Sequence, residues 1–475
     1  EWTKAMLVSP YRADFEKEYG TLMFLNAEIA LKTFSPEIIP ELQKENDLTT
    51  EYDKLIASAQ IPFEGGVYTL SQLSPFKTGA DDAQRLAAWK AEGQWYKDNQ
   101  AKFDELYDKL VKLRDAMGKK LGYKGYTELG YYRMGRNCYG KADVEKFRAA
   151  VRKYLVPVAE SIYQEQAKRL GKTYPLSFAD AALSFRSGNP RPCGDAEHIL
   201  AHGQKFYDEL SPETSAFFRM MRERELLDIL STEGKAAGGY CCTIPDYDVP
   251  FIFANFNGTQ HDVEVVTHEA GHAFAFYRAM NSDIYQDLRE PTIEACECHS
   301  MSMEFLTQDY HKYFFGAQTA KYELAHCEDS LDFIPYGCMV DEFQHIMYQQ
   351  PDLTPDERNA VWLELEKKYR PWNKFGDLPF YGRGAGWQRQ LHIFECPFYY
   401  IDYCLATAIA LQFFVASLKD HKDAWQRYMK LTNLAGMATY TELAESAGMK
   451  APFTKGSLTE LSRAVADWIE QHQVS

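Results

Sequence analysis

The sequence predicts a mainly α-helical fold with a small β-sheet beside a metal-binding helix. Three observations support this prediction. The first two hundred residues and residues 211–230 read as successive helices. The good strand candidates near the HEAGH segment lie at residues 241–244 and 250–256, and HEAGH at residues 268–272 lies inside an amphipathic helical pattern. The 475 residues contain no linker rich in Pro, Gly or Ser, so we expect one multi-lobed body.

The net charge and the cysteine content indicate which partners and which cell compartment to expect. The net charge of -16, without clustered Lys and Arg, argues against nucleic acid and an anionic membrane surface as partners. Ten cysteines without a CxxC pair fit reduced thiols, and the chain opens without a signal sequence, so we expect a cytoplasmic protein. Because an initiator Met is missing, we also expect the natural chain to start further upstream. The oligomeric state is left open.

The first half of the chain carries helix signals but no evident chemistry. Ser35-Pro36-Glu37 resembles a helix start, and residues 81–121 and 144–170 have the composition of exposed helices. The aromatic segment 131–136 is interpreted as core packing, since an aromatic stripe on a helix is usually buried, and contact with a ligand is the alternative. Near the other end, residues 404–418 form the longest apolar run, but it is shorter than a bilayer span and includes Gln412, so we expect a core helix.

Two strand candidates precede the HEAGH segment. Residues 241–244 and 250–256 are rich in aromatic and β-branched residues. A strand that leads into a metal-binding helix can pair with the backbone of a peptide, and a buried hairpin without a ligand is the alternative. The first interpretation makes Phe253, Ala254 and Asn255 candidate substrate contacts.

The HEAGH segment predicts a metal site. His268 and His272 are four residues apart, so a helix presents both imidazoles on one face. Glu269 is rotated by about 100° around the helix axis from His268. It therefore lies beside the ion and can exchange a proton with a metal-bound water, as in a zinc hydrolase. Thr259 and Asp262 have the spacing of a capping box, and residues 281–283 supply a stop signal. An ordinary helix with two unrelated histidines is the alternative.

A third metal ligand is expected on the following helix, which begins near Pro291. The tenth residue after His268 is Arg278, so no third histidine follows on the same segment. A carboxylate is the natural completion of a catalytic zinc site, which takes three protein ligands. Four candidates share one helix face, and spacing alone does not choose among them: Glu290, Glu294, Glu297 and Glu304.

The late segment 381–403 combines a glycine-rich loop with a histidine and several tyrosines. No suitable strand precedes the loop and no Gly-Lys-Ser/Thr follows it, so a nucleotide site is not expected. His392 and the phenols behind it can donate hydrogen bonds to a developing oxyanion. The candidates in this segment are Gly384, His392, Tyr399, Tyr400 and Tyr403.

At four ordered segments the chain resembles the thimet oligopeptidase and oligoendopeptidase F family of zinc metallopeptidases, most closely the oligoendopeptidase F branch. The segments are FIFANFNGT, THEAGHAF, TIEACECHSMSMEF and GRGAGWQRQLHIFECPFYYIDY, and the similarity extends from about residue 15 to the C-terminus. The resemblance implies a mainly helical, zincin-type fold with two lobes around a deep substrate channel. We place an N-terminal lobe at residues 1–190 and a catalytic lobe at 191–475, with interleaving allowed, and the family pattern also implies further sequence before residue 1.

The resemblance also implies roles for particular residues. The family's third ligand is a Glu followed by Ser three residues later and Glu seven residues later, a pattern that Glu297, Ser300 and Glu304 match. This implies one Zn²⁺ held by His268, His272 and Glu297, with Glu269 as general base and acid. It further assigns His392, Tyr399 and Tyr403 to stabilisation of the tetrahedral intermediate, and Gly384 and Tyr400 to substrate contacts.

We therefore expect a zinc-dependent oligoendopeptidase that hydrolyses internal bonds of short peptides. Glu304 is a candidate partner for a ligand histidine, and His261 and Glu264 either line the cleft or cap the helix start. A metallocarboxypeptidase is the first alternative. A non-catalytic peptide-binding protein with a vestigial metal site is the second, and it is disfavoured because Glu269 would serve no purpose in a structural site.

Overall fold

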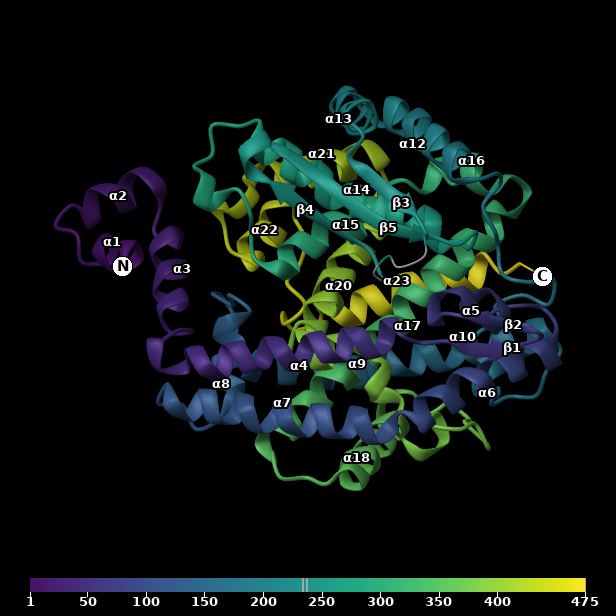
Figure 1. The fold of residues 1–475 in the computed structure, drawn as a ribbon. Helices are drawn as coiled ribbons and strands as arrows, with labels where there is room; N and C mark the ends of the chain where they lie inside the picture. Colours follow the sequence, from purple (N-terminus) through teal and green to yellow (C-terminus); the bar gives the residue numbers. More distant parts are fainter. Residues whose placement is uncertain (233–234, 236–237, 475) are drawn as a thin grey trace. The chain divides into compact units, whose positions relative to one another are not determined.

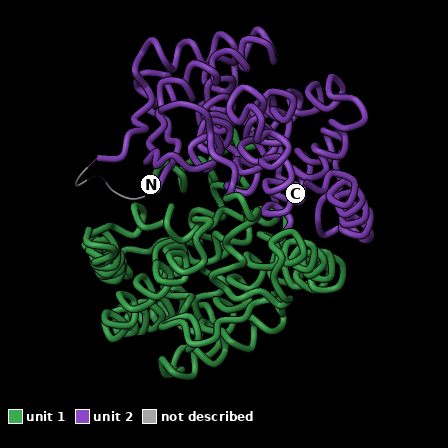
Figure 2. The backbone as a smooth tube through the Cα atoms, turned by 90° about the vertical axis from the view of Figure 1, so that its right-hand side faces the viewer, with its two compact units in different colours: residues 1–13, 24–188, 332–404 green, residues 14–23, 189–331, 405–475 purple. Residues whose placement is uncertain are grey.

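The protein is described by a computed structural model that covers residues 1–232, 235 and 238–474. Helices dominate (Figure 1), and the chain divides into two compact units (Figure 2). Unit 1 comprises residues 1–13, 24–188 and 332–404, and unit 2 comprises residues 14–23, 189–331 and 405–475. The two helical units confirm the predicted two-lobed, mainly helical fold. The units alternate along the chain, since residues 14–23 belong to unit 2 and residues 332–404 belong to unit 1.

Unit 1 is built from helices and one β-hairpin. Its elements are α1 (Trp2–Leu7), α4 (Ile39–Ala57), β1 (Ile61–Phe63), β2 (Gly66–Tyr68), α5 (Leu70–Lys77), α6 (Asp82–Asp98), α7 (Gln100–Lys120), α8 (Tyr126–Arg133), α9 (Lys141–Tyr154), α10 (Val156–Leu170), α11 (Phe178–Ala181), α18 (Pro355–Tyr369) and α19 (Leu391–Glu395). Four further helices contain a boundary between the units: α2 (Arg12–Tyr19), α3 (Leu22–Leu31), α17 (Thr319–Gln349) and α20 (Tyr400–Ser417).

Unit 2 contains a three-stranded sheet that packs against helix α14 (His261–Met280). Its elements are α12 (Ala196–Leu210), α13 (Pro212–Glu223), β3 (Leu227–Leu230), β4 (Tyr240–Ile244), β5 (Val249–Phe256), α14 (His261–Met280), α15 (Ile293–Leu306), α16 (Lys312–Phe315), α21 (His421–Leu434), α22 (Tyr440–Ser446) and α23 (Ser457–Gln471). Short 3₁₀ helices occur at Pro36–Ile38, Pro245–Tyr247, Gln286–Leu288, Gln308–Tyr310, Gly316–Gln318, Tyr381–Arg383, Gly386–Arg389 and Ala435–Met437.

Two predictions about core elements can be compared with the structure. Tyr131 on α8 and Met134 just after the helix are both 8% exposed, which agrees with core packing for these two residues, whereas Tyr132 is half-buried and Arg133 is exposed. Helix α20 is, among the described residues, the one that is long and apolar enough to cross a membrane, and 72% of it is buried within the protein. This burial agrees with the core helix expected from residues 404–418.

The sheet of unit 2 has the strand order β3-β5-β4. Strand β5 pairs in parallel with β3 and antiparallel with β4, so its backbone groups are used on both sides. The interpretation in which the strand leading into the HEAGH helix pairs with the backbone of a peptide therefore does not apply to β5. Among the described residues, the strand beside α14 with an unpaired outer edge is β4.

The start of α14 also differs from the prediction. The helix begins at His261 with Gln260 as its N-cap residue, and Thr259 and Asp262 do not form a capping box. Instead, the Asp262 carboxylate accepts hydrogen bonds from the backbone N–H groups of Asn257 (2.9 Å) and Gly258 (2.8 Å). Asp262 thus fixes the loop that joins β5 to α14, and the helix ends at Met280, as the stop signal predicted.

Candidate metal centre

Helices α14 and α15 pack closely along their lengths, and Gly271 makes this contact possible. A Cβ atom at Gly271 would lie 2.7 Å from Cα of Ser300 and 2.9 Å from the carbonyl oxygen of His299. No side chain larger than hydrogen fits there without a shift of the α15 backbone. The glycine inside HEAGH therefore sets the separation of the two helices, and with it the distance from the two histidines to α15.

The substitution Gly271→Ala should destabilise the protein even though alanine favours helices by up to about 1 kcal/mol. Backbone overlap with α15 should outweigh that gain and give a net loss of about 1–2 kcal/mol. Chemical denaturation measures this loss. Gly203→Ala on α12 is the control, because its methyl group meets only side-chain atoms, at 3.2 Å, and should cost less. Equal stability of the Gly271→Ala protein and the wild type would contradict the packing argument.

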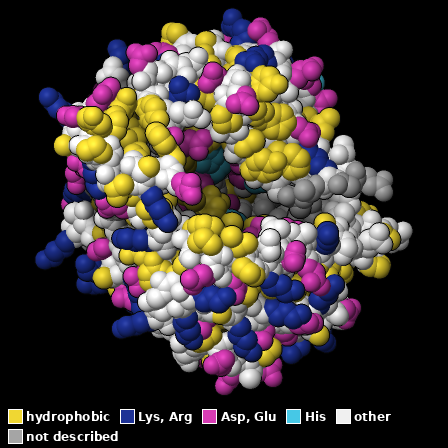
Figure 3. Space-filling view, turned by 60° about the vertical axis from the view of Figure 1, so that its left-hand side comes forward, with side chains coloured by type: hydrophobic (Ala, Val, Ile, Leu, Met, Phe, Trp, Pro, Cys, Tyr) yellow, Lys and Arg dark blue, Asp and Glu magenta, His cyan; other side chains and the backbone are white. Residues whose placement is uncertain are grey.

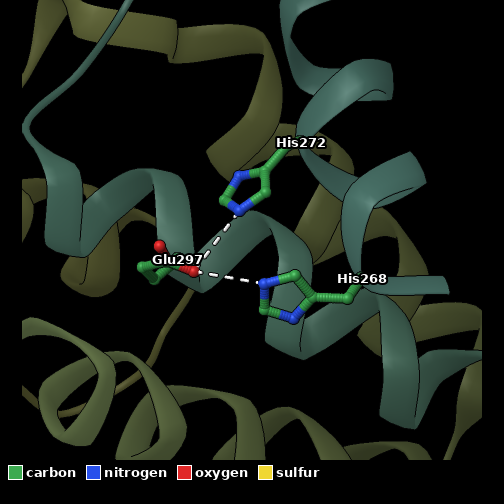
Figure 4. Close-up of side chains that lie close together, drawn as sticks. All are labelled: His268, His272 and Glu297. Carbon is green, nitrogen blue, oxygen red and sulfur yellow. Dashed lines mark ion pairs between the residues drawn. The ribbon is translucent and has the colours of Figure 1, made fainter. Parts of the chain in front are cut away.

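Three potential metal ligands converge at this helix contact (Figure 4). Oε2 of Glu297 lies 3.4 Å from Nε2 of His268 and 3.3 Å from Nε2 of His272. Their ligand atoms all lie within 4.8 Å of one another. Among the four glutamates that spacing left open, the structure brings Glu297 to the histidines, as the family pattern implied.

The distances in this triad fit a metal ion better than direct ion pairs. A charge-assisted N–H···O hydrogen bond is about 2.7–2.9 Å long, shorter than the observed 3.3 and 3.4 Å. Tetrahedral zinc with bonds of about 2.0–2.1 Å places its ligand atoms about 3.3 Å apart. Two imidazole nitrogens and one carboxylate oxygen are also the donor set of a catalytic zinc site with one position left for water. The residues present therefore fit the implied ion.

Glu297 is held in place as an anion. It is 3% exposed, and Oγ of Ser300 donates a hydrogen bond of 3.1 Å to its Oε2. Burial alone would raise the pKa of Glu297, but the neighbouring His272 and His268 outweigh burial and hold the pKa well below its usual range. An ionised carboxylate is the form that binds a metal.

Glu304 orients one of the two histidines. Its Oε1 lies 2.6 Å from Nδ1 of His268, and its Oε2 lies 2.7 Å from Nε2 of His326 on α17. Burial raises the pKa of Glu304, but the hydrogen bonds of the two histidines outweigh it and lower the pKa to about 2. An ionised carboxylate only accepts hydrogen bonds, so Nδ1 of His268 carries a proton. In the neutral form that binds a metal, the ring has its lone pair at Nε2, the atom that lies 3.4 Å from Oε2 of Glu297.

The substitution Glu304→Gln should weaken zinc binding about 10-fold or more, because outer-shell partners of metal-binding histidines have effects of this size. The new amide offers an N–H group where one histidine now donates, so the two hydrogen bonds cannot both be kept. Competition with a chromogenic chelator measures the affinity. Unchanged affinity would show that Glu304 does not orient His268.

The remaining carboxylate candidates have other surroundings. Glu290 accepts a hydrogen bond of 2.9 Å from Oγ1 of Thr243 on β4. Glu294 is completely buried on α15. Glu264 pairs with His261 (3.2 Å) and accepts from the amide of Gln260 (3.1 Å), which agrees with the helix-start alternative for this pair.

Glu269 lies half-buried on α14 and supplies no atom to the triad. It lies near Cys241 of the edge strand β4. Burial raises the pKa of the Cys241 thiol well above its usual value, and the Glu269 carboxylate raises this pKa further. All ten cysteines are free thiols. On the face drawn in Figure 3, histidine side chains are visible near the middle with acidic side chains beside them.

The three candidate substrate contacts on β5 make contacts within unit 2. Ala254 is fully buried and packs against Ile229 and Val265. The ring of Phe253 stacks on Tyr240 of β4 with centroids 5.1 Å apart, and the amide of Asn255 donates to the carbonyl of Gly238 (2.9 Å). Their contact with a peptide stays a prediction.

The late-segment residues form a cluster of their own in unit 1. Nε2 of His392 lies 3.3 Å from the hydroxyl of Tyr403, and Nδ1 lies 2.9 Å from the amide of Gln390. The rings of Tyr399 and Tyr400 lie 5.4 and 5.0 Å from the His392 ring. The four predicted residues His392, Tyr399, Tyr400 and Tyr403 are thus neighbours.

Backbone conformation and close packing explain why residue 384 is a glycine. Its φ is +75°, and a Cβ atom there would lie 2.3 Å from the carbonyl oxygen of Asn359 on α18. Both facts favour glycine without any ligand. A substrate contact at Gly384 stays a prediction.

The fold and the metal centre can now be compared with known proteins. Residues 211–461 match the model of peptidase family M3, which covers more than half of the chain. The chain belongs to peptidase family M3. This agrees with the oligopeptidase resemblance found in the sequence.

Individual relatives and solved structures are similar to this chain over different lengths. An X-ray structure at 3.1 Å of a candidate oligoendopeptidase F is 46% identical with a TM-score of 0.96, covering 99% of this chain and 83% of that chain. PZ peptidase A with an inhibitor is 45% identical with a TM-score of 0.96, covering 99% and 83%. An oligoendopeptidase F homolog of Borreliella burgdorferi (strain ATCC 35210 / DSM 4680 / CIP 102532 / B31) is 23% identical over 296 residues, which are 59% of this chain. The match spans about half, 48%, of that relative's length.

Proposed function

We propose that this chain is a zinc-dependent endopeptidase that hydrolyses internal bonds of short peptides in the cytoplasm. One observation carries the proposal: the metal-ligand geometry of His268, His272 and Glu297, with Glu269 beside it, in a chain of peptidase family M3. The expectation that nucleic acid and membranes are not partners belongs to the same proposal and rests on the net charge of -16.

In the proposed hydrolysis, residues of unit 2 hold the metal ion and transfer the proton. When bound, the zinc ion would supply Lewis-acid chemistry, which lowers the pKa of water and polarises the scissile carbonyl. Glu269 accepts a proton from the attacking water and delivers it to the leaving amine. Glu304 keeps the proton of His268 at Nδ1, so that Nε2 stays a ligand atom. The edge of β4 is the candidate surface for the peptide backbone.

Donors for the tetrahedral oxyanion are assigned to the His392 cluster. The sequence pattern and the shared hydrogen-bonding chemistry of His392, Tyr399 and Tyr403 support this assignment. Tyr403→Phe should lower kcat/KM about 100-fold, because one oxyanion donor is worth this much or more. Stacking on Tyr399 can persist without the hydroxyl group.

Tyr132→Phe is the matched control for this prediction, since it removes a phenol hydroxyl from a half-buried ring on α8 of the same unit. It should leave kcat/KM near the wild-type value. Equal rates for Tyr403→Phe and Tyr132→Phe would remove Tyr403 from the catalytic assignment.

Mass spectrometry of products tests the function as a whole. Peptides of mixed sequence, roughly 5 to 30 residues long, are incubated with zinc-loaded protein, with chelator-treated protein and with the Glu269→Gln variant. Internal cuts that disappear in both controls support the endopeptidase. Release of single C-terminal residues would instead indicate a carboxypeptidase, and intact peptides throughout would indicate binding without catalysis.

A further inference from the structure

Helix α17 contributes a histidine to the neighbourhood of the metal centre that the ligand motifs do not include. Nε2 of His326 lies 2.7 Å from Oε2 of Glu304, while the other oxygen of the same carboxylate lies 2.6 Å from Nδ1 of His268. Each oxygen of Glu304 thus has one histidine partner. The three side chains form a continuous hydrogen-bonded chain from α17 through α15 to α14.

The His326 ring is itself fixed in place. It is 5% exposed, and it stacks on Tyr322 with centroids 5.6 Å apart and an interplanar angle of 18°. The centroid of the Phe305 ring lies 4.7 Å from that of His326. The backbone of α17 carries both His326 and Tyr322, one helical turn apart. The ring is therefore a rigid partner for the more flexible side chain of Glu304.

We propose that His326 is a positioning residue for the metal centre, acting through Glu304. By donating Nε2–H to Oε2, it holds the carboxylate in the one orientation in which Oε1 accepts from Nδ1 of His268. A glutamate with a single partner can rotate about its terminal bonds, and a second partner on a rigid ring restricts that rotation. The inference rests on the proposed metal site and adds a residue that the HEAGH and Glu-rich motifs do not contain.

A neighbouring histidine provides a structural comparison. His311 is as deeply buried, at 2% exposed, and its ring centroid lies 6.2 Å from that of His326. The hydrogen bonds of the Glu304 carboxylate go to His268 and His326, not to His311. Loss of the His311 ring therefore disturbs the same core without removing a hydrogen-bond partner of the Glu304 carboxylate.

Two polar variants of His326 separate positioning from packing. His326→Gln places an amide N–H near the position of Nε2, whereas His326→Asn places it near that of Nδ1 and falls short of Glu304. The zinc dissociation constant of each purified full-length variant is measured by competition with a chromogenic chelator, alongside its thermal unfolding without metal. His311→Leu is measured in parallel.

We expect His326→Asn to raise the zinc dissociation constant about 10-fold, and His326→Gln to stay within about 3-fold of the wild type. His311→Leu should lower thermal stability but leave the dissociation constant unchanged. Wild-type affinity in His326→Asn, or an equal loss in His311→Leu, would overturn the inference while the proposed function stands. Failure of the wild type to bind one zinc ion per chain would instead overturn the proposed metal site.

Discussion

Replacement of Glu269 by glutamine should lower kcat/KM by about 10²- to 10⁴-fold, the range expected when a general base is removed. Zinc content should remain at one ion per chain, because Glu269 supplies no ligand atom to the triad of His268, His272 and Glu297. Cleavage of an internally quenched peptide and elemental analysis of the same sample measure both quantities.

An exposed carboxylate in the same unit provides the control for this variant. Glu213→Gln in the first turn of α13 removes one negative charge and should leave kcat/KM unchanged. Near-wild-type turnover by Glu269→Gln with zinc bound would assign proton transfer to another group. Loss of zinc together with activity would mean that Glu269 is a ligand.

Replacement of Glu297 by alanine should abolish stoichiometric zinc binding. The two histidines alone leave the ion with one protein ligand fewer than a catalytic site normally has, so the loss should exceed the roughly 10- to 100-fold effect of outer-shell changes. Activity should fall below detection, and the rise in Tm on addition of zinc should disappear, since a ligand stabilises only the state that binds it. Dialysis followed by elemental analysis gives the stoichiometry.

Glu290→Gln is the matched control, because Glu290 shares the predicted helix face with Glu297 but bonds to Thr243 on β4. It should retain one zinc ion per chain. If Glu290→Gln loses zinc and Glu297→Ala keeps it, the ligand assignment made from the 3.3 and 3.4 Å distances is wrong.

The sequence predictions that the structure confirms depend on residues close together in the chain. The two histidines of HEAGH share a face because helical spacing requires it, and the stop signal after residue 280 depends only on neighbouring residues. The choice of Glu297 among four glutamates needed more than spacing, since all four lie on one predicted face. The family pattern supplied that choice, and the contact of α14 with α15 at Gly271 gives its physical reason.

Long-range contacts account for what the sequence left open. His326 lies 22 residues after Glu304, on another helix, and no spacing rule links the two. The order of strands decided that β4, not β5, has the free edge, and strand order depends on the whole unit rather than on the strand itself. Asp262 had the spacing of a capping box but reaches the loop before the helix, because Asn257 and Gly258 present their N–H groups to it.

The position of the three ligands in the chain has a consequence for how the protein assembles. All of them lie within residues 268–297, on two consecutive helices of unit 2. Closing the short loop between His272 and Glu297 costs less entropy than joining remote parts of the chain, by about 0.6 kcal/mol for each halving of the loop length. Zinc binding should therefore stabilise the contact between α14 and α15. Amide hydrogen exchange in unit 2 should slow when zinc is added, while the helices of unit 1 should exchange at the same rates as before.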